Sequence, residues 1–157
     1  MPKLTTNAEN ILKGDEAGTF VTTNPVIGYK KIECSSQWSL FGLVNFGRIK
    51  DRKFVAQVTI PKDETIIRSL ERYSAPYNDY DSKEPSDKLR TTSFDLDKIF
   101  HNPLLSINKC HSIYEPNYEY TPGASHKPDK FDTEEHYTCT NGLHFFTQKS
   151  KAEDYSK

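Results

Sequence analysis

The chain has 157 residues, a length typical of one domain with a single hydrophobic core. Its 21 basic and 22 acidic residues give a net charge of -1, which excludes a strong electrostatic attraction to nucleic acid polymers or anionic membranes. No segment reaches the roughly 18 consecutive apolar residues of a spanning helix, and the first residues lack the apolar centre of a signal peptide, so we expect a soluble intracellular protein.

The three cysteines are expected to be reduced thiols. Cys34, Cys110 and Cys139 are too few, and of the wrong parity, for the disulfide framework of a small secreted protein.

The first half of the chain predicts two core strands. Residues 1–22 are interpreted as an N-terminal extension of a single α+β domain over 23–157. The segment 26–33 (VIGYKKIE) follows a turn dipeptide and has partial alternation of apolar groups. The segment 54–60 (FVAQVTI) alternates regularly, with the period of two that a half-buried strand requires.

The middle of the chain predicts a short helix followed by a long exposed loop. The segment 61–73 (PKDETIIRSLERY) opens with a proline and two acids and carries Ile66, Ile67 and Leu70 at helical spacing. Residues 73–87 contain two prolines and several acids without periodicity, which is typical of a loop that is functional or mobile.

The last part of the chain returns to strand patterns. Strands are expected near 88–96 and in 117–121 (NYEYT). Asn141-Gly142 lies between two β-compatible runs and predicts a hairpin turn. Thr147 is placed to cap a final helix over 148–155. The expected fold is therefore α+β, a mostly antiparallel sheet with a short C-terminal helix and one additional short helix.

Several segments resemble a domain of unknown function found in phages and large DNA viruses, often after pentapeptide repeats. The similar segments are GYKK (28–31), VAQVTIPKD (55–63), KLRTTSFDLDKI (88–99) and the C-terminal run that ends in CTNGLHFF (139–146) and the final helix. The resemblance covers roughly residues 26–155, and its most specific part is a Cys-x-x-Gly-Ile/Leu-His-Phe-Phe motif. Leu89 stands where the family tends to have a cysteine, and this chain carries no pentapeptide repeats. The family has no assigned activity.

Cys139 and His144 raise three alternatives. A thiolate beside an imidazole can be a nucleophile, but no residue is marked by its spacing to orient the imidazole ring. A zinc site would need further ligands, and the available ones are Cys34, Cys110, His111 and His136. The simplest interpretation is a buried structural cysteine and a histidine that faces either the core or a ligand pocket. We therefore predict no catalytic residue, and for a metal only Cys139, His144 and Cys110 are candidates.

Two other groups of residues suggest nucleotide chemistry. Arg90, Ser93 and Glu115 or Glu119 follow the order of key residues in ADP-ribosyltransferase-like enzymes, although a structural ion pair explains Arg90 more simply. The tyrosine cluster (Tyr114, Tyr118, Tyr120 and Tyr137) could stack on a base or a sugar, or pack in the core or against a protein partner.

The preferred hypothesis is a virus-encoded accessory binding domain, non-enzymatic and without a cofactor, in the host cytoplasm. It would act on a host or viral protein or sequester a small nucleotide-like ligand. No nucleic acid polymer or membrane is expected as a partner, and the formation of homo-oligomers is an open possibility. The candidate ligand-binding residues are Tyr29, Arg90, Tyr120, Asn141 and His144. The alternatives are a nucleotide-using transferase of ADP-ribosyltransferase-like type and a small zinc-binding structural module.

Overall fold

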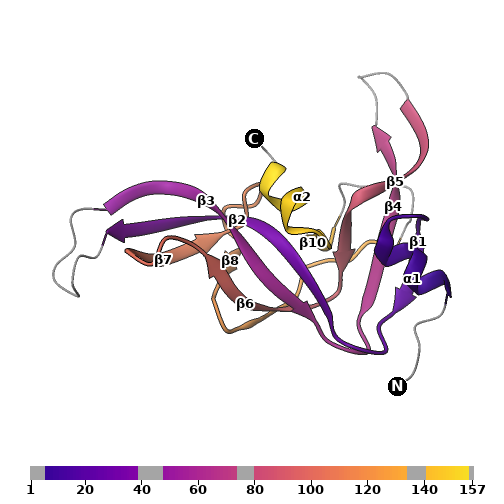
Figure 1. Ribbon diagram of the computed structural model, residues 1–157, viewed down its shortest axis with the longest axis horizontal. Coiled ribbons are helices and arrows are strands. Elements are labelled where there is room, and N and C mark those ends of the chain that lie inside the picture. The colour runs from indigo at the N-terminus through magenta and orange to yellow at the C-terminus, as the bar shows by residue number, and fades with distance from the viewer. Residues whose placement is uncertain (1–5, 39–47, 74–79, 134–140, 156–157) are drawn as a thin grey trace.

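The computed structural model describes residues 6–38, 48–73, 80–133 and 141–155 (Figure 1). The elements are, in chain order, α1 (Thr6–Lys13), β1 (Gly18–Val21), β2 (Val26–Trp38), β3 (Arg48–Ile60), β4 (Thr65–Tyr73), β5 (Tyr80–Thr91), β6 (Phe94–Phe100), β7 (Leu105–His111), β8 (Glu119–Tyr120), β9 (Ser125–His126), β10 (Leu143–Phe145) and α2 (Lys149–Asp154). This composition confirms the expected α+β class with two short helices. None of the helices in these ranges has the length and apolar character needed to cross a membrane.

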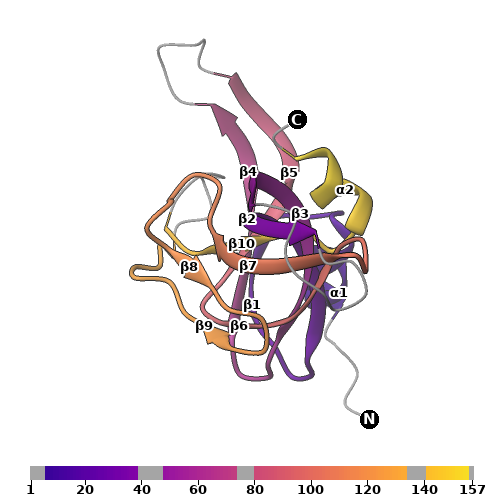
Figure 2. The ribbon, with the colours of Figure 1, turned by 90° about the vertical axis from the view of Figure 1, so that its left-hand side faces the viewer.

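The strands form two antiparallel sheets. The first sheet has the order β1-β4-β5-β10, and the second has the order β8-β7-β2-β3-β6-β9. The long β2–β3 pair is the centre of the second sheet, and the β4–β5 pair extends away from it past α2 (Figures 1 and 2). The predicted strands at 26–33 and 54–60 are confirmed, and both continue further than their apolar patterns indicated.

The main hydrophobic core draws on both sheets. The first sheet contributes Ile66, Leu89, Leu143 and Phe145, and the second contributes Ile32, Cys34, Ala56, Val58, Ile60, Phe94, Leu96, Cys110 and Tyr120. Burial of these apolar groups is the main force that holds the two sheets together.

The two sheets meet most closely where β10 crosses β2. The backbones of Tyr29 and Phe146 exchange two hydrogen bonds, each 2.7 Å between nitrogen and oxygen. Gly28 makes this approach feasible, because a Cβ at that position would lie 2.5 Å from Cδ2 of Phe145. The glycine of the GYKK segment is thus explained by close packing against the last strand.

The helix predicted over 61–73 is wrong, because these residues form a turn and strand β4. Asp63 adopts a positive φ of 68°, which closes the turn after β3. Ile66 and Ile67 are both fully buried, so both faces of the strand are covered and no alternation reveals it. Their β-branched side chains suit the extended backbone.

The long loop predicted over 73–87 is also largely wrong, because β5 begins at Tyr80. Its Pro85 is opposite Leu70, where the register of the β4–β5 pair shifts on both sides. Such irregular pairing tolerates a proline that lacks a backbone donor. Residues 74–79 lie outside the described ranges.

The segment expected as an N-terminal extension carries α1 and β1, and β1 pairs with β4. Buried Arg68 joins the helix to the first sheet. Its guanidinium donates to the carbonyl oxygens of Ile11 (2.5 Å) and Leu12 (3.1 Å) near the end of α1, and to that of Ser86 (2.5 Å) on β5. Ile11 is itself fully buried, so this segment contributes to the folded structure.

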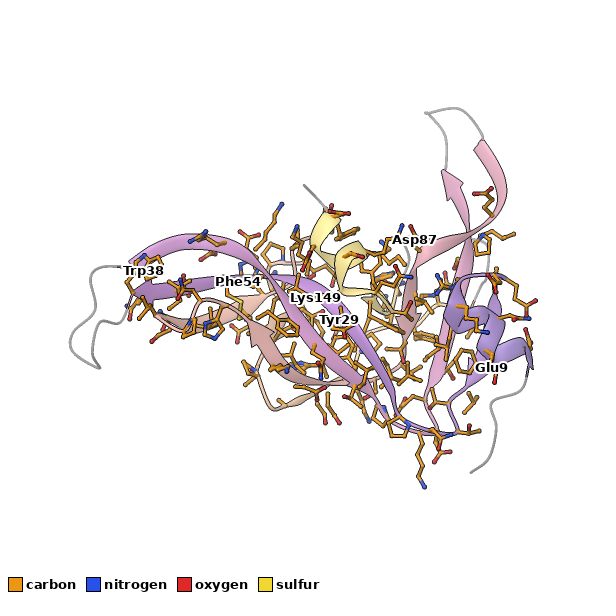
Figure 3. All side chains as sticks on the ribbon, viewed as in Figure 1. Glu9, Tyr29, Trp38, Phe54, Asp87 and Lys149 are labelled. Carbon is orange, nitrogen blue, oxygen red and sulfur yellow. A yellow bond between two sulfur atoms is a disulfide. The ribbon has the colours of Figure 1, made fainter. Side chains whose placement is uncertain are left out.

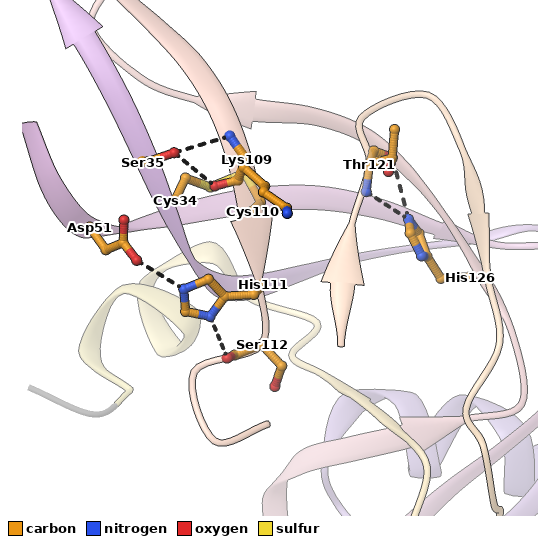
Figure 4. The surroundings of a disulfide bond; sticks show 9 residues. All are labelled: Cys34, Ser35, Asp51, Lys109, Cys110, His111, Ser112, Thr121 and His126. Carbon is orange, nitrogen blue, oxygen red and sulfur yellow. Dashed lines mark hydrogen bonds and ion pairs between the residues drawn. A yellow bond between two sulfur atoms is a disulfide. The ribbon is translucent and has the colours of Figure 1, made fainter. Parts of the chain in front are cut away.

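The expectation of reduced thiols is wrong for two of the cysteines, because Cys34 and Cys110 form a disulfide between β2 and β7 (Figure 4). They are direct neighbours in the antiparallel register, with Cα atoms 4.1 Å apart. The two cysteines are 76 residues apart in the sequence, so their pairing could be seen only once the sheet brought them together.

The C-terminal segment differs from the expectation in two details. β10 follows Asn141-Gly142 and pairs with β5, while the residues on the other side of the expected hairpin, 134–140, lie outside the described ranges. The predicted cap at Thr147 is wrong, because Gln148 is the N-cap of α2 and makes no side-chain cap hydrogen bond. At the C-terminal end of the helix, the amine of Lys31 donates to the carbonyl oxygens of Glu153 and Tyr155.

Candidate ligand-binding cleft

A cleft of about 1290 Å³ lies between β2, β5, β10, α2 and the segments around β8 and 128–130. Its walls carry five lysines, namely Lys30, Lys31, Lys88, Lys130 and Lys151, and four tyrosines, namely Tyr114, Tyr118, Tyr120 and Tyr155. The acids Asp87, Glu115, Asp129 and Asp154 lie among them. The cleft therefore offers both cationic groups and aromatic faces, the combination that recognises an anionic aromatic molecule.

Lys30 is a strongly perturbed group of the cleft. Its amine donates a 2.8 Å hydrogen bond to the carbonyl oxygen of His144 and lies 5.7 Å from the ring centroid of Tyr120. Burial, helped by the charge of Lys88 and opposed by that of Glu115, lowers the pKa of Lys30 to about 7. Within the described residues the amine forms no ion pair with a carboxylate. The partly buried amine of Lys30 therefore has no direct counter-charge in the described part of the chain.

The tyrosines of the cleft form two ring contacts. Tyr118 and Tyr120 lie 5.1 Å apart between ring centroids, and Tyr114 meets Tyr155 edge to face at 5.9 Å. Burial raises the pKa of both Tyr118 and Tyr120, so their phenols are neutral at physiological pH. Neutral rings of this kind can stack on a flat ligand without repelling its anionic groups.

Polar contacts hold α2 against the side of the cleft. Asp87 on β5 forms a 3.3 Å ion pair with Lys151 on α2 and lies beside that helix (Figure 3). The amine of Lys88 lies 5.2 Å from the ring centroid of Tyr155, the residue that ends α2. Because the ion pair is largely exposed, it contributes little stability and mainly positions the helix.

The structure brings together three of the five predicted ligand-binding residues. Tyr120, Asn141 and His144 line the cleft. Tyr29 does not, because its ring packs near Phe100, at 6.4 Å between centroids, in a small core next to α2. Figure 3 labels Tyr29 close to Lys149, whose amine lies over the same Phe100 ring.

Arg90 also lies outside the residues that line the cleft. Its side chain is only 1% exposed, and its guanidinium donates to the carbonyl oxygen of Asp132 (3.0 Å) and the hydroxyl of Ser69 (2.5 Å). These internal hydrogen bonds match a structural role. Ser93 is buried as well.

The two glutamates proposed with Arg90 have different surroundings. Glu115 lines the cleft, whereas Glu119 forms a 2.8 Å ion pair with Lys109 on β7. The residues suggested for an ADP-ribosyltransferase-like centre are therefore not gathered in one open site.

The predicted metal candidates are distributed differently from the expectation. Cys110 is bonded to Cys34, so its sulfur is no thiolate ligand. His144 lines the cleft, while Cys139, His136 and Tyr137 lie outside the described residues.

Lys30 is a candidate binding residue that the sequence interpretation missed, although the chain contains a signal for it. Gly28, Lys30, Ile32 and Cys34 share one face of β2, and the other three are buried. A lysine among core-facing positions of a strand is rare unless its amine has a function or a partner.

Comparison with known proteins places the chain among sequences of unassigned activity. Residues 15–152 match the family model described as "Family of unknown function (DUF5758)". The chain is also similar to "Uncharacterized protein L223" of Acanthamoeba polyphaga mimivirus, with 24% identity over 156 residues and coverage of 92% of each chain. This relative agrees with the viral character expected from the resemblance. No solved structure matches the fold. Because the family model spans most of the chain, the protein belongs to the DUF5758 family of unknown function.

Proposed function

We propose that this protein is a binding domain that holds a small nucleotide-like ligand in the cleft. The observation that carries the proposal is the buried amine of Lys30, which faces the cleft without a carboxylate partner among the described residues and is close enough to Lys88 to feel its charge. A buried cation is unfavourable unless an anion compensates it. A phosphate group bound between Lys30 and Lys88 would supply that charge.

The remaining chemistry of the cleft supports the same class of ligand. A volume of about 1290 Å³ exceeds the roughly 300–1,000 Å³ of ordinary small-molecule sites, so a nucleotide would fit. Tyr118 and Tyr120 offer rings for the base, since stacking on an aromatic side chain is tolerant of base identity. Asn141 and His144 contribute polar groups at the same wall.

Binding accounts for the cleft better than transfer chemistry. The internal hydrogen bonds of Arg90 and its burial remove the residue that the ADP-ribosyltransferase-like alternative needs in its pocket. In a viral setting, a domain of this kind would sequester its ligand. Sequestration needs affinity alone, and the cleft supplies groups for affinity.

A thermal-shift panel tests the proposal. The purified protein is heated with AMP, ADP or ATP, with adenosine as a base without phosphate, and with tripolyphosphate as a phosphate without a base. A ligand that binds only the folded protein raises Tm in proportion to the logarithm of its concentration above Kd. We expect nucleotides to raise Tm more than adenosine or tripolyphosphate does.

Two variants separate the cleft from non-specific anion binding. Lys30→Met removes the amine inside the cleft, and Lys62→Met removes an exposed lysine in the turn after β3. The nucleotide shift should disappear in Lys30→Met and persist in Lys62→Met. A panel in which no nucleotide stabilises the wild-type protein would refute the proposed function.

A further inference from the structure

Three neighbouring strands of the second sheet present metal-ligating side chains at one place. His111 on β7, Glu33 on β2 and Asp51 on β3 have ligand atoms that all lie within 4.8 Å of one another. Nε2 of His111 and Oδ2 of Asp51 are 3.2 Å apart (Figure 4). One imidazole nitrogen and two carboxylates converge there.

The orientation of the His111 ring is fixed by a residue outside this group. Its Nδ1 lies 2.9 Å from the carbonyl oxygen of Ser112 (Figure 4). Since carbonyl and carboxylate oxygens only accept, both ring nitrogens donate here, Nδ1 to Ser112 and Nε2 to Asp51, and Nε2 is the nitrogen that a bound metal ion would engage. Metal-ligating histidines commonly have this arrangement, in which a backbone carbonyl holds the nitrogen that does not bind the metal.

The backbone around the three side chains is held in place. Glu33 and His111 are direct partners in the β2–β7 register, and the next pair is the disulfide of Cys34 and Cys110. Beside them, the register of the β2–β3 pair shifts between Cys34 and Ser36, at the level of Asp51. Bulges of this kind often redirect a side chain next to a functional site.

We propose that Glu33, Asp51 and His111 bind a divalent transition-metal cation, with Zn²⁺ as the best match. Tetrahedral Zn²⁺ at about 2.0–2.2 Å from its ligands needs ligand atoms roughly 3.3–3.6 Å apart. Small rotations of the partly exposed Glu33 and Asp51 would bring all three within that range. Imidazole with carboxylates favours Zn²⁺ over Mg²⁺ and Ca²⁺, which prefer oxygen ligands alone. Three protein ligands leave a fourth position for water.

The charges around the site predict how its affinity can be tuned. Lys53 on β3 is the register partner of Glu33, so its ammonium group competes with a metal for that carboxylate. Removing this charge in Lys53→Met should tighten metal binding. The site does not depend on the ligand-binding cleft, because none of its three ligands lines the cleft.

Isothermal titration of the full chain with ZnCl₂ at pH 7.5 tests the site. We expect binding of Zn²⁺ that is lost in His111→Ala and weakened at least about 10-fold in Glu33→Gln and Asp51→Asn, the size of effect seen when metal sites lose supporting groups. His101→Ala is the matched control. Nδ1 of His101 also lies near the following carbonyl oxygen, that of Asn102 at 2.8 Å, but His101 belongs to no group of potential ligands among the described residues.

A spectroscopic measurement identifies the ligand type. Co²⁺ bound to nitrogen and oxygen ligands shows ligand-field bands without the intense thiolate charge-transfer band that Cys139 would produce. The proposal is overturned if wild type binds no Zn²⁺, if His111→Ala binds as well as His101→Ala, or if the thiolate band dominates. Weaker Zn²⁺ binding in Lys53→Met than in wild type would also contradict the proposed position of the metal ion.

Discussion

Removal of the Cys34–Cys110 disulfide should lower the free energy of unfolding by about 2–4.5 kcal/mol. The bond closes a loop with a sequence separation of 76 residues, for which the chain-entropy relation gives about 4.5 kcal/mol at 25 °C as an upper value. Native disulfides typically contribute about 2–4 kcal/mol, because the denatured chain keeps some structure. Both sulfurs are buried in the main core, so we choose Cys34→Ala with Cys110→Ala to avoid buried unpaired polar groups.

Urea unfolding with and without a phosphine reductant measures this contribution. The wild-type midpoint should fall after full reduction, whereas the double variant should give the same midpoint in both conditions. Cys139→Ala is the control and should keep the response to reductant. A thiol assay on the denatured, unreduced protein should detect one free thiol of the three cysteines. Three free thiols, or a wild-type midpoint that is insensitive to reductant, would refute the disulfide.

Three further substitutions test other parts of the structure by urea unfolding. Lys30 has a pKa of about 7 in the folded protein and 10.5 as an isolated group, so the unfolded chain binds more protons between these values and stability rises with pH there. Lys30→Met should therefore stabilise the protein more at pH 6 than at pH 10, by about 1 kcal/mol or more; an equal effect at both pH values would argue against the buried amine. Gly28→Ala should lower the free energy of unfolding by about 1–3 kcal/mol, because the added Cβ would overlap the Phe145 ring. An unchanged free energy of unfolding would exclude the close approach of β10 to β2. Arg68→Met should lower the free energy of unfolding by about 2–4 kcal/mol, because three hydrogen bonds from a charged group are lost. Arg52→Met, at an exposed position, is the control. Equally small losses in the two variants would contradict the anchoring of α1 by Arg68.

The sequence predicted those elements whose pattern arises from one covered and one open face. The alternation in 54–60 identified the second half of β3, and the partial alternation in 26–33 identified the start of β2. The sequence pattern led to a wrong prediction at β4, where Ile66 and Ile67 are both buried and the apolar spacing resembles that of a helix. Local periodicity cannot distinguish a strand covered on both faces from a buried helix.

Long-range pairing explains the other failures. β5 carries Pro85 and many charges, and its pairing with β4 and β10, rather than its own pattern, makes it a strand. The disulfide likewise depends on the β2–β7 pairing, which no spacing along the chain reveals.

The candidate site was predictable in part. His144 and Asn141 were identified from the chemistry of the CTNGLHFF segment, and Tyr120 from the tyrosine cluster, and all three line the cleft. Arg90 is a candidate because of the residue order that it shares with ADP-ribosyltransferase-like enzymes, but the fold uses its guanidinium for internal hydrogen bonds. Lys30 was overlooked because a lysine in a strand usually faces solvent.

Calorimetric titration of the protein with ADP is the most direct test of the proposed ligand-binding cleft. At pH 6.5, where the Lys30 amine is largely charged, we predict one binding site with a Kd of about 1 mM or tighter, or at least about 4 kcal/mol of binding free energy. Lys30→Met should weaken this binding by about 10-fold or more, and Lys62→Met should leave it unchanged. Equal affinity in wild type and Lys30→Met, or the absence of binding by wild type, would contradict the assignment of the cleft.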